Sequence, residues 1–262
     1  MYGYFLIENS GVRVGCNSEY CCILNFGRGD PMNFCIVLSG GIGNRMSSDI
    51  PKQYMTVNGR PILIHTIQSI QQCSNVNKII IVAHPDYHTH ITNWIKEFQI
   101  HTEVYLTENG DSRQESILQG LKKCMQISNN ENDAVIIHDA VRPFISVDLI
   151  DRCLEALTHH DGAMPVIPVK DTLYYSENGN QITDLLNRDK IFAGQAPEAF
   201  LLQKYYRINE NLTKSELESI RGTTEIAFRH NFNIALVDGE EANFKITTPE
   251  DFELYKEKVG SK

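Results

Sequence analysis

The sequence has little of what marks several protein classes. Its 24 Lys and Arg against 33 Asp and Glu give a net charge of −9, and we find no basic stripe of the kind that nucleic-acid-binding surfaces carry. No apolar stretch approaches the roughly 20 residues that a membrane span needs. The seven cysteines form no CxxC pair and stand at no zinc-finger spacing to a histidine. We therefore expect no nucleic-acid or membrane partner, and free thiols in a reducing compartment, the cytoplasm.

The composition is that of an ordinary globular protein. Of 262 residues, 42% are hydrophobic and 22% are charged, which excludes a mostly disordered chain. Residues 1–31 differ from the rest of the chain, because they show no clear period and hold three of the seven cysteines. They also lack the basic start and long apolar core of a signal peptide. We expect residues 1–31 to be an extension that need not be native, with an arm packed on the domain as the alternative, and residues 32–262 to form the functional domain.

Short apolar runs alternate with amphipathic stretches beyond this extension. The continuous apolar runs are typical of strands buried on both faces of a sheet, and Ser112 with Glu115 forms a capping-box signature at one helix start. The expected strands span 33–38, 78–83, 102–106, 133–138, 162–167 and 233–237. The expected helices start at 61 and span about 87–98, 112–126, 146–159 and 248–259. This alternation predicts an α/β fold with a mostly parallel, twisted sheet flanked by helices.

Residues 168–197 interrupt this alternation with two short β-like runs around Glu177-Asn-Gly-Asn180. Asn-Gly between such runs is a strong hairpin signal. We therefore expect a β-hairpin arm that projects from the sheet. Its role stays open between a plain surface hairpin and an arm that dimerises the protein.

Glycines and two cations come after the first expected strand. Ser39-Gly-Gly-Ile-Gly-Asn-Arg-Met46 is followed closely by Pro51-Lys-Gln-Tyr54, and glycines there let backbone N–H groups approach phosphate oxygens. Ligands of such sheets bind beyond the carboxyl ends of the strands. A P-loop is excluded because no GK[ST] occurs, and a dinucleotide fingerprint is excluded because its third glycine position is Met46. Arg45 and Lys52 are therefore the expected phosphate-binding cations.

Three further clusters stand near strand or helix ends. Gly110-Asp-Ser-Arg-Gln-Glu-Ser116 lies at a loop-to-helix junction, where small polar groups can read the edge of a nucleobase. His138-Asp-Ala-Val-Arg-Pro143 comes directly after the most apolar strand, and its acid is placed to meet ribose hydroxyls or Mg²⁺. In Asn243–Asp251, Lys245 is expected on a short strand just before the last helix. The structural alternatives are a capped helix start, an Asp–Arg turn and a solvated lysine.

Together these clusters resemble one family, the cytidylyltransferases that make CDP-alcohols from methylerythritol 4-phosphate or ribitol 5-phosphate. The resemblance covers about residues 32–258 and presents the family's motifs in order, including Asp171-Thr172 and the arm residue Arg188. It implies a Rossmann-like nucleotidyltransferase fold and a homodimer formed through the β-arm.

The resemblance also implies roles for individual residues. The residues implied around CTP are Leu38, Ser39, Gly40, Gly41, Gly43, Gly110, Asp111, Arg113, Ser116, Asp139 and Ala140. The implied catalytic residues are Arg45, Lys52, Arg188 and Lys245, and the implied ligand of Mg²⁺ is Asp139. The residues implied around the alcohol phosphate are Arg142, Asp171, Thr172, Arg188 and Lys245. Pyrophosphate leaves without a general acid once its charge is screened, so no histidine is expected to be catalytic.

Two departures from the family pattern concern the acceptor. The loop begins Ser39-Gly40 where methylerythritol enzymes usually have two alanines, and Gln195-Ala-Pro-Glu198 stands where they usually read QTPQ. We therefore expect ribitol 5-phosphate or a similar polyol phosphate as the acceptor. The alternatives are methylerythritol 4-phosphate, as in isoprenoid biosynthesis, then a UTP- or GTP-dependent sugar 1-phosphate enzyme, then an inactive nucleotide-binding relative. The HDAVRP and NFKITTPED runs argue against the sugar 1-phosphate enzymes, and retention of the expected site cations argues against an inactive relative.

Overall fold

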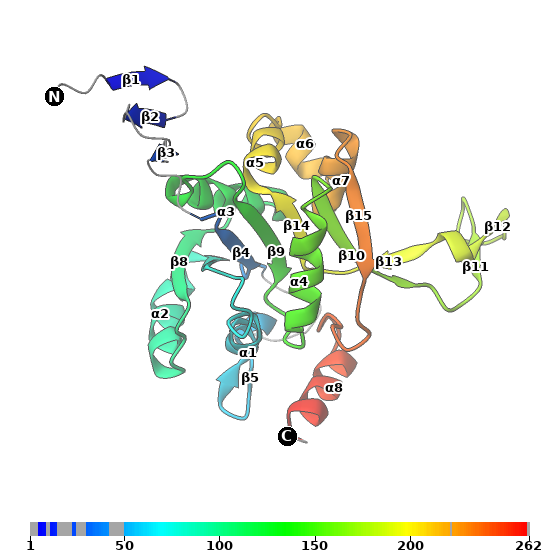
Figure 1. Ribbon diagram of the computed structural model, residues 1–262. Helices are drawn as coiled ribbons and strands as arrows, with labels where there is room; N and C mark the ends of the chain where they lie inside the picture. Colours follow the sequence, from blue (N-terminus) through cyan, green and yellow to red (C-terminus); the bar gives the residue numbers. More distant parts are fainter. Residues whose placement is uncertain are drawn as a thin grey trace.

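The computed structural model describes residues 5–8, 11–14, 23–24, 30–41, 50–220 and 222–260. Its centre is an eight-stranded sheet in the order β13-β10-β14-β9-β4-β7-β8, and β15 also pairs with β10, in parallel (Figure 1). The strands are β4 (Asn33–Leu38), β7 (Lys78–Ala83), β8 (Glu103–Glu108), β9 (Ala134–Asp139), β10 (Gly162–Pro168), β13 (Phe192–Gly194), β14 (Glu198–Leu201) and β15 (Ile234–Asp238). Only β13 and β14 run against the others within this sheet of the described chain. The predicted mostly parallel α/β sheet is therefore confirmed.

The central strands are apolar along their whole length because both of their faces are covered. Every residue of β9 is buried, and in β4 the four residues from Phe34 to Val37 are fully buried. Parallel pairing sets Cys35 beside Ile136 on one side of β4 and beside Ile79 on the other. The carboxyl ends of β4, β7, β8 and β9 consequently meet at one edge of the sheet.

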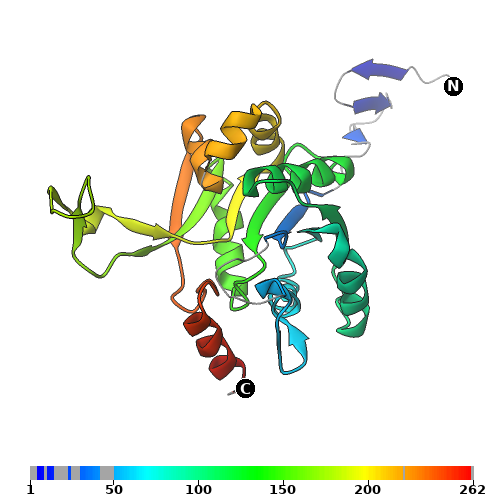
Figure 2. The same ribbon diagram turned by 180° about the vertical axis from the view of Figure 1, so that it is seen from behind.

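Helices form a layer on each face of the sheet. The helices are α1 (Ile62–Ile70), α2 (His88–Glu97), α3 (Arg113–Ile127), α4 (Val147–Ala156), α5 (Leu202–Glu210), α6 (Lys214–Ser219), α7 (Thr223–Arg229) and α8 (Pro249–Gly260). Apolar side chains of α1, α2 and α4 pack on one face, and those of α3, α5 and α7 pack on the other. The last helix, α8, packs through Tyr255 against Val57, Ile62 and Val141 at one end of the molecule, away from α5 to α7 in both views (Figures 1 and 2). None of the described helices is long and apolar enough to cross a membrane.

The predicted hairpin is present within residues 168–197. Strand β11 (Leu173–Tyr175) pairs antiparallel with β12 (Asp184–Leu186), and this pair stands away from the body of the molecule (Figure 1). The chain returns to the sheet through the 3-10 turn η3 (Arg188–Lys190) and β13. Short elements elsewhere are β1 (Phe5–Glu8), β2 (Gly11–Val14), β3 (Ile23–Leu24), η1 (Lys52–Tyr54), β5 (Thr56–Val57), β6 (Arg60–Pro61) and η2 (Pro85–Tyr87).

Two local predictions need correction. Lys245 was expected on a short strand, but residues 243–247 have no strand pairing and form an extended segment between β15 and α8. A single backbone bond, from the N–H of Ile246 to the carbonyl of Val141 at 3.0 Å, holds this segment against the loop after β9. Asp139 was expected just beyond its strand, whereas it is the last residue of β9.

Candidate active site

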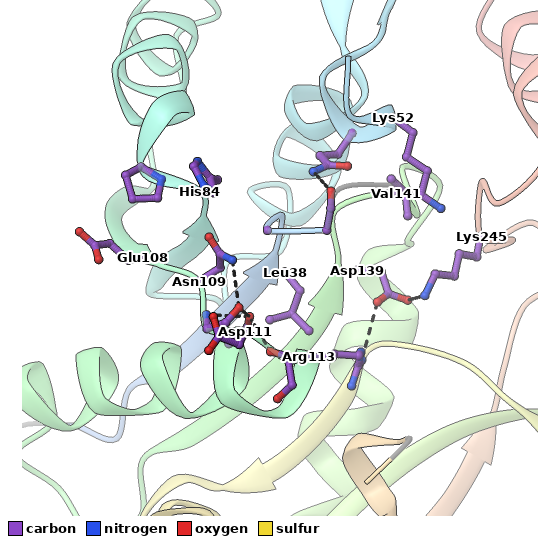
Figure 3. Close-up of a pocket in the computed structure, with 17 residues that line it drawn as sticks. Leu38, Lys52, His84, Glu108, Asn109, Asp111, Arg113, Asp139, Val141 and Lys245 are labelled. Atoms are coloured by element: carbon purple, nitrogen blue, oxygen red, sulfur yellow. Dashed lines mark hydrogen bonds and ion pairs between the residues drawn. The ribbon is translucent and has the colours of Figure 1, made fainter. Parts of the chain in front are cut away.

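A cavity of about 920 Å³ opens at the edge where the carboxyl ends of four parallel strands meet (Figure 3). It is lined by Leu38, Gly40, Gly41, Lys52, Gln53, His84, Pro85, Glu108, Asn109, Gly110, Asp111, Ser112, Arg113, Ser116, Asp139, Val141 and Lys245. These residues follow or end β4, β7, β8 and β9, or belong to the segments packed beside them. This is the position at which open α/β sheets bind their ligands.

Four parts of the sequence that lie far apart along the chain meet in this cavity. They are the start of the glycine-rich loop, the PKQ segment, the start of α3 and the segment that carries Lys245. Lys52 and Lys245 lie at one end of the cavity, and His84 and Glu108 lie at the other (Figure 3). Among the described lining residues, the two lysines therefore lie at the end of the cavity away from Glu108.

The glycine-rich loop begins directly after β4. Leu38, Gly40 and Gly41 line the cavity, while Ser39 is buried behind them. The Ser39 N–H donates to the carbonyl of Val82 at 2.8 Å, which fixes the first turn of the loop to the neighbouring strand. Gly43 and Arg45, predicted as triphosphate contacts, lie outside the described residues.

Lys52 reaches the cavity from the segment that packs beneath this loop. Its Nζ donates to the backbone carbonyl of Ile246 at 2.8 Å, so the PKQ segment and the Lys245 segment are tied together. Lys245 Nζ lies 3.0 Å from a carboxylate oxygen of Asp139. Two ammonium groups from opposite ends of the sequence are thus held on the same side of the cavity (Figure 3).

Three cations surround the carboxylate of Asp139. Its nearly buried carboxylate lies 3.0 Å from Lys245 Nζ, 3.1 Å from Arg142 Nε and 3.7 Å from Arg113 Nη2. Burial alone would raise the pKa of this carboxyl, but the three cations outweigh it and hold the pKa well below its usual range. The cations gathered around this one carboxylate can also attract the anionic groups of a ligand.

The capped start of α3 forms the cavity wall opposite the lysines. Ser112 accepts a hydrogen bond from the N–H of Glu115 at 3.1 Å, as the capping signature predicts. Ser116 Oγ accepts from the N–H of Gly110 at 3.1 Å and binds the loop to the helix. A side chain at Gly110 would collide with Glu115, since an added Cβ would lie 2.3 Å from its Cγ. The predicted Gly110, Asp111, Arg113 and Ser116 therefore share one rigid junction that lines the cavity.

Arg113 connects this wall to a second carboxylate, Glu198, which the sequence singled out as a departure from the methylerythritol pattern. Its guanidinium donates to Thr223 Oγ1 at 2.6 Å and lies 3.9 Å from Glu198. Glu198 is buried and accepts a hydrogen bond from Thr224 at 3.0 Å. Burial raises the pKa of Glu198, and the neighbouring carboxylate of Asp139 adds to this, while Arg113 opposes it. Arg113 thus lies between two acids on adjacent strands.

Two predicted residues lie beside the cavity and not among those that line it. Arg142 is mostly buried, and its Nη1 donates to the carbonyl of Asn243 at 2.7 Å while its Nε faces Asp139. Ala140 is buried, and its carbonyl accepts from Thr66 at 2.8 Å. Arg142 therefore forms an ion pair with Asp139 without lining the cavity itself.

The predicted residues of the arm lie apart from the cavity. Asp171, Thr172 and Arg188 are exposed and do not line the cavity. The guanidinium of Arg188 donates to the carbonyl of Lys170 at 2.8 Å within its own arm. Arg188 lies in η3, just after the second strand of the hairpin.

Sequence reasoning missed several residues that line the cavity, namely Gln53, His84, Pro85, Glu108, Asn109, Ser112 and Val141. The same rule that singled out Asp139 would have found some of them, because His84 and Asn109 directly follow β7 and β8. Gln53 belongs to the PKQ run but had no predicted role of its own. No local pattern indicates Gln53, because its partners lie across the loop.

His138 precedes Asp139 but is not among the residues that line the cavity. It is fully buried, and its Nε2 lies 3.1 Å from the carbonyl of Arg142. Burial lowers the pKa of His138 to about 4, so the imidazole is neutral at pH 7. The His138 ring is therefore neutral and lies within hydrogen-bond distance of a loop carbonyl.

The described part of the chain contains no cluster of three or more His, Cys, Asp and Glu side chains that could hold a metal ion. Asp139 is instead a single buried carboxylate at the cavity wall. Mg²⁺ is commonly bound by one or two carboxylates together with phosphates of a nucleotide. The donor set therefore fits a metal that arrives with a phosphorylated ligand.

Comparison with known proteins matches the sequence of this chain to one family. Residues 34–259 match the family described as 2-C-methyl-D-erythritol 4-phosphate cytidylyltransferase, IspD. A 2-C-methyl-D-erythritol 4-phosphate cytidylyltransferase of Lachnospira eligens is 33% identical over 228 residues, which are 85% of this chain and 97% of that one. A ribitol-5-phosphate cytidylyltransferase of Streptococcus pneumoniae is 31% identical over 236 residues, which are 87% of this chain and 99% of that one.

A solved structure supports the fold independently. The 4-diphosphocytidyl-2C-methyl-D-erythritol synthase of Anaerococcus prevotii superposes with a TM-score of 0.73 at 23% identity, over 88% of this chain and 99% of that chain. The resemblance expected from the motifs is confirmed. The chain belongs to the 2-C-methyl-D-erythritol 4-phosphate cytidylyltransferase (IspD) family and is a nucleotidyltransferase enzyme.

Proposed function

We propose that this enzyme transfers CMP from CTP to an alcohol phosphate and releases pyrophosphate. The observation that carries the proposal is the Asp139 carboxylate surrounded by Lys245, Arg142 and Arg113 at the edge of a cavity that a glycine loop lines. Such a site gathers cations around one carboxylate beside exposed loop backbone, which suits two phosphorylated substrates. The family assignment supports the same chemistry.

The charge distribution of the cavity supports one orientation of CTP. The triphosphate lies at the lysine end, against Gly40 and Gly41, with Lys52 as one of its cations. The resemblance to the family implies Ser39, Gly43 and Arg45 as further contacts. Cytosine lies against the rigid start of α3, where Gly110, Asp111, Arg113 and Ser116 offer polar groups to its edge. The ribose lies between them, near Leu38, Asp139 and Ala140.

The reaction needs no covalent enzyme intermediate. A phosphate oxygen of the acceptor attacks the α-phosphorus of CTP, the new P–O bond forms in line, and the bond to the β-phosphate oxygen breaks. The products are a CDP-alcohol and pyrophosphate, whose extra negative charge the lysine end of the cavity stabilises. Lys52, Lys245 and Arg45 act by holding and screening the reacting phosphates, which is how most phosphoryl transfer is catalysed. The neutral His138 takes no part.

Mg²⁺ fits this site as a cofactor that enters with CTP. Asp139 is the residue that would hold it, with the triphosphate oxygens as its other ligands. The metal supplies charge neutralisation of the triphosphate and of the leaving pyrophosphate.

The acceptor we propose is ribitol 5-phosphate or a similar polyol phosphate, with 2-C-methyl-D-erythritol 4-phosphate as the alternative. Relatives of both names match the chain at similar identity. Support for the polyol comes from two positions at which this chain departs from the QTPQ run usual in methylerythritol enzymes. Ala196 stands in place of the threonine and its hydroxyl, and Glu198 stands in place of the second glutamine and its amide. Glu198 lies beside Arg113, next to the cavity, and its ionised carboxylate would accept hydrogen bonds from ligand hydroxyls, whereas an amide also donates.

We further propose that the site is completed by a second copy of this chain. Arg188, Asp171 and Thr172 are exposed on the arm and do not line the cavity of their own chain. Exposed apolar side chains of the arm offer a surface for such a partner: Tyr174, Tyr175, Ile182, Leu185, Leu186 and Phe192. In the homodimer, the arm of one subunit would bring Arg188 to the acceptor phosphate of the other.

The cellular setting we propose is the cytoplasm. The four described cysteines, Cys35, Cys73, Cys124 and Cys153, are free and buried. Free thiols are typical of proteins in a reducing compartment.

Pyrophosphate release by the purified enzyme with Mg²⁺ tests the function. Each of CTP, UTP, GTP and ATP is supplied with ribitol 5-phosphate, 2-C-methyl-D-erythritol 4-phosphate or a sugar 1-phosphate. We expect turnover with CTP and ribitol 5-phosphate to exceed every other pair. A preference for UTP or GTP with the sugar 1-phosphate would replace the proposal, and no release with any pair would favour an inactive relative.

A further inference from the structure

Gln53 donates two hydrogen bonds to the glycine loop, and no other described side chain bonds to both of the carbonyls that accept them. It lies in η1 beside Lys52 and is 4% exposed. Its Nε2 donates to the carbonyl oxygen of Ser39 at 2.7 Å and to that of Gly41 at 2.8 Å. A side-chain amide has two N–H donors, so both are used on this one loop.

These contacts set the direction of the loop's peptide groups. In a trans peptide the C=O and the following N–H point in opposite directions. With the Ser39 carbonyl turned toward Gln53, the N–H of Gly40 points to the other side. Among the described residues, neither Gly40 nor Gly41 donates its backbone N–H to an acceptor. The loop therefore presents N–H groups without partners in the described chain while its carbonyls are turned inward.

The space in front of this loop is open. Gly41 is exposed, and a Cβ added there would meet no atom of the described residues within 4 Å. Gly41 also lines the cavity, so this space belongs to the cavity. A carbonyl oxygen released by Gln53 could turn into it and would repel the oxygens of an anionic ligand.

Tyr54 holds the same loop but only at its first residue. Its hydroxyl donates to the Ser39 carbonyl at 3.0 Å and accepts from Ser39 Oγ at 3.1 Å. Burial raises the pKa of Tyr54 to about 12, so this hydroxyl keeps its proton. Within the described chain, Gln53 is the one side chain that donates to the Gly41 carbonyl.

We propose that Gln53 is a positioning residue for nucleotidyl transfer, which keeps the carbonyls of the glycine loop turned inward so that its N–H groups face the triphosphate. The inference rests on the proposed use of CTP. Glutamine suits the task because it donates twice without adding charge beside Lys52. A glutamate would place acceptor oxygens against two carbonyls, and a methionine would offer no donor.

The test compares Gln53→Met and Gln53→Glu with a matched control, Gln68→Met. Gln68 lies on α1, and its amide reaches the carbonyl of Phe98, away from the cavity. We expect Gln53→Met to raise the KM for CTP and the inhibition constant of inorganic tripolyphosphate together by about 10-fold to 100-fold, because two hydrogen bonds that orient the loop are lost. Gln53→Glu should raise both further. The KM for the acceptor should stay within about 2-fold of the parent's, and Gln68→Met should behave as the parent.

Direct binding of tripolyphosphate, measured by calorimetry, separates this inference from the proposed function. If the parent turns over no CTP, the function fails, while the parent and Gln53→Met still show whether Gln53 tunes anion binding by the loop. Unchanged tripolyphosphate binding in folded Gln53→Met overturns the inference, as does an equal loss of affinity for both substrates. If Gln53→Glu does not fold, tripolyphosphate binding by Gln53→Met is compared with that by Tyr54→Phe, and this comparison tests the role of Gln53. Tyr54→Phe should have the smaller effect, because Gly41 stays held.

Discussion

The shared active site can be tested by recombining two damaged subunits. Lys52 lines the cavity of its own chain, whereas Arg188 is exposed on the arm and bonds only to the Lys170 carbonyl among described residues. If each site takes Lys52 from one chain and Arg188 from its partner, a dimer of Lys52→Ala with Arg188→Ala contains one intact site. The other site of the same dimer carries both defects.

The expected recovery is set by this geometry. Removing a cation aimed at reacting phosphates lowers turnover about 10²-fold to 10³-fold, so neither parent variant should exceed about 1% of native activity. Random reassociation of equal amounts makes about half of the dimers mixed, and each has one intact site of two, so the pool recovers about a quarter of native activity. A purified mixed dimer should recover about half.

The assay is pyrophosphate release after coexpression of the two variants with different affinity tags, which isolates mixed dimers. Lys190→Ala, a charge removed from the same exposed turn as Arg188, serves as the control and should remain active. Isolated mixed dimers that gain nothing over the parent variants would refute the shared site. A fully active monomer at micromolar concentration would refute the arm proposal altogether.

Three other perturbations test separate parts of the site. Lys52→Ala should lower kcat about 10²-fold to 10³-fold with an unchanged thermal midpoint, and a loss below about fivefold would remove Lys52 from the catalytic residues. Buried His138 has a pKa of about 4, which is lower than its pKa in the unfolded chain. Because the unfolded chain takes up this proton first, the free energy of unfolding should fall by about 3 kcal/mol as the pH falls from about 6.5 to 4. In urea unfolding, the His138→Gln variant should lose less stability than the parent over this pH range. An identical loss in both proteins would contradict the low pKa of His138. The double variant Ala196→Thr/Glu198→Gln should raise kcat/KM for 2-C-methyl-D-erythritol 4-phosphate relative to ribitol 5-phosphate, and an unchanged ratio would exclude these positions from acceptor choice.

The sheet and most of its helices could be predicted because their signals are local. The bounds of β4 and β7 match the predicted 33–38 and 78–83, since each is a continuous apolar run that ends where polar or small residues begin. Ser112 marks the start of α3 by its own hydrogen bond to Glu115. The antiparallel strand β14 was not predicted, because its place between β9 and β10 depends on pairing with strands distant in sequence.

The site was predictable where one motif carries its own partners, and not where partners come together through the fold. Asp139 and Arg142 belong to one turn, so their contact at 3.1 Å is a local property of the HDAVRP run. The position of Glu198 beside Arg113 requires β14 to lie next to β9, and no local pattern shows that. Lys245 was assigned to a strand because its apolar neighbours look β-like, but Phe244 and Ile246 pack against the α8 cluster instead.

The central claim is that an acceptor phosphate oxygen attacks the α-phosphorus of CTP. Ribitol 5-phosphate labelled with ¹⁸O in its phosphate tests this directly when the products are analysed by mass spectrometry. We predict that CDP-ribitol retains all of the label, including the bridging oxygen, and that the pyrophosphate is unlabelled. Label in the pyrophosphate, or consumption of CTP without a CDP-alcohol product, would contradict the account.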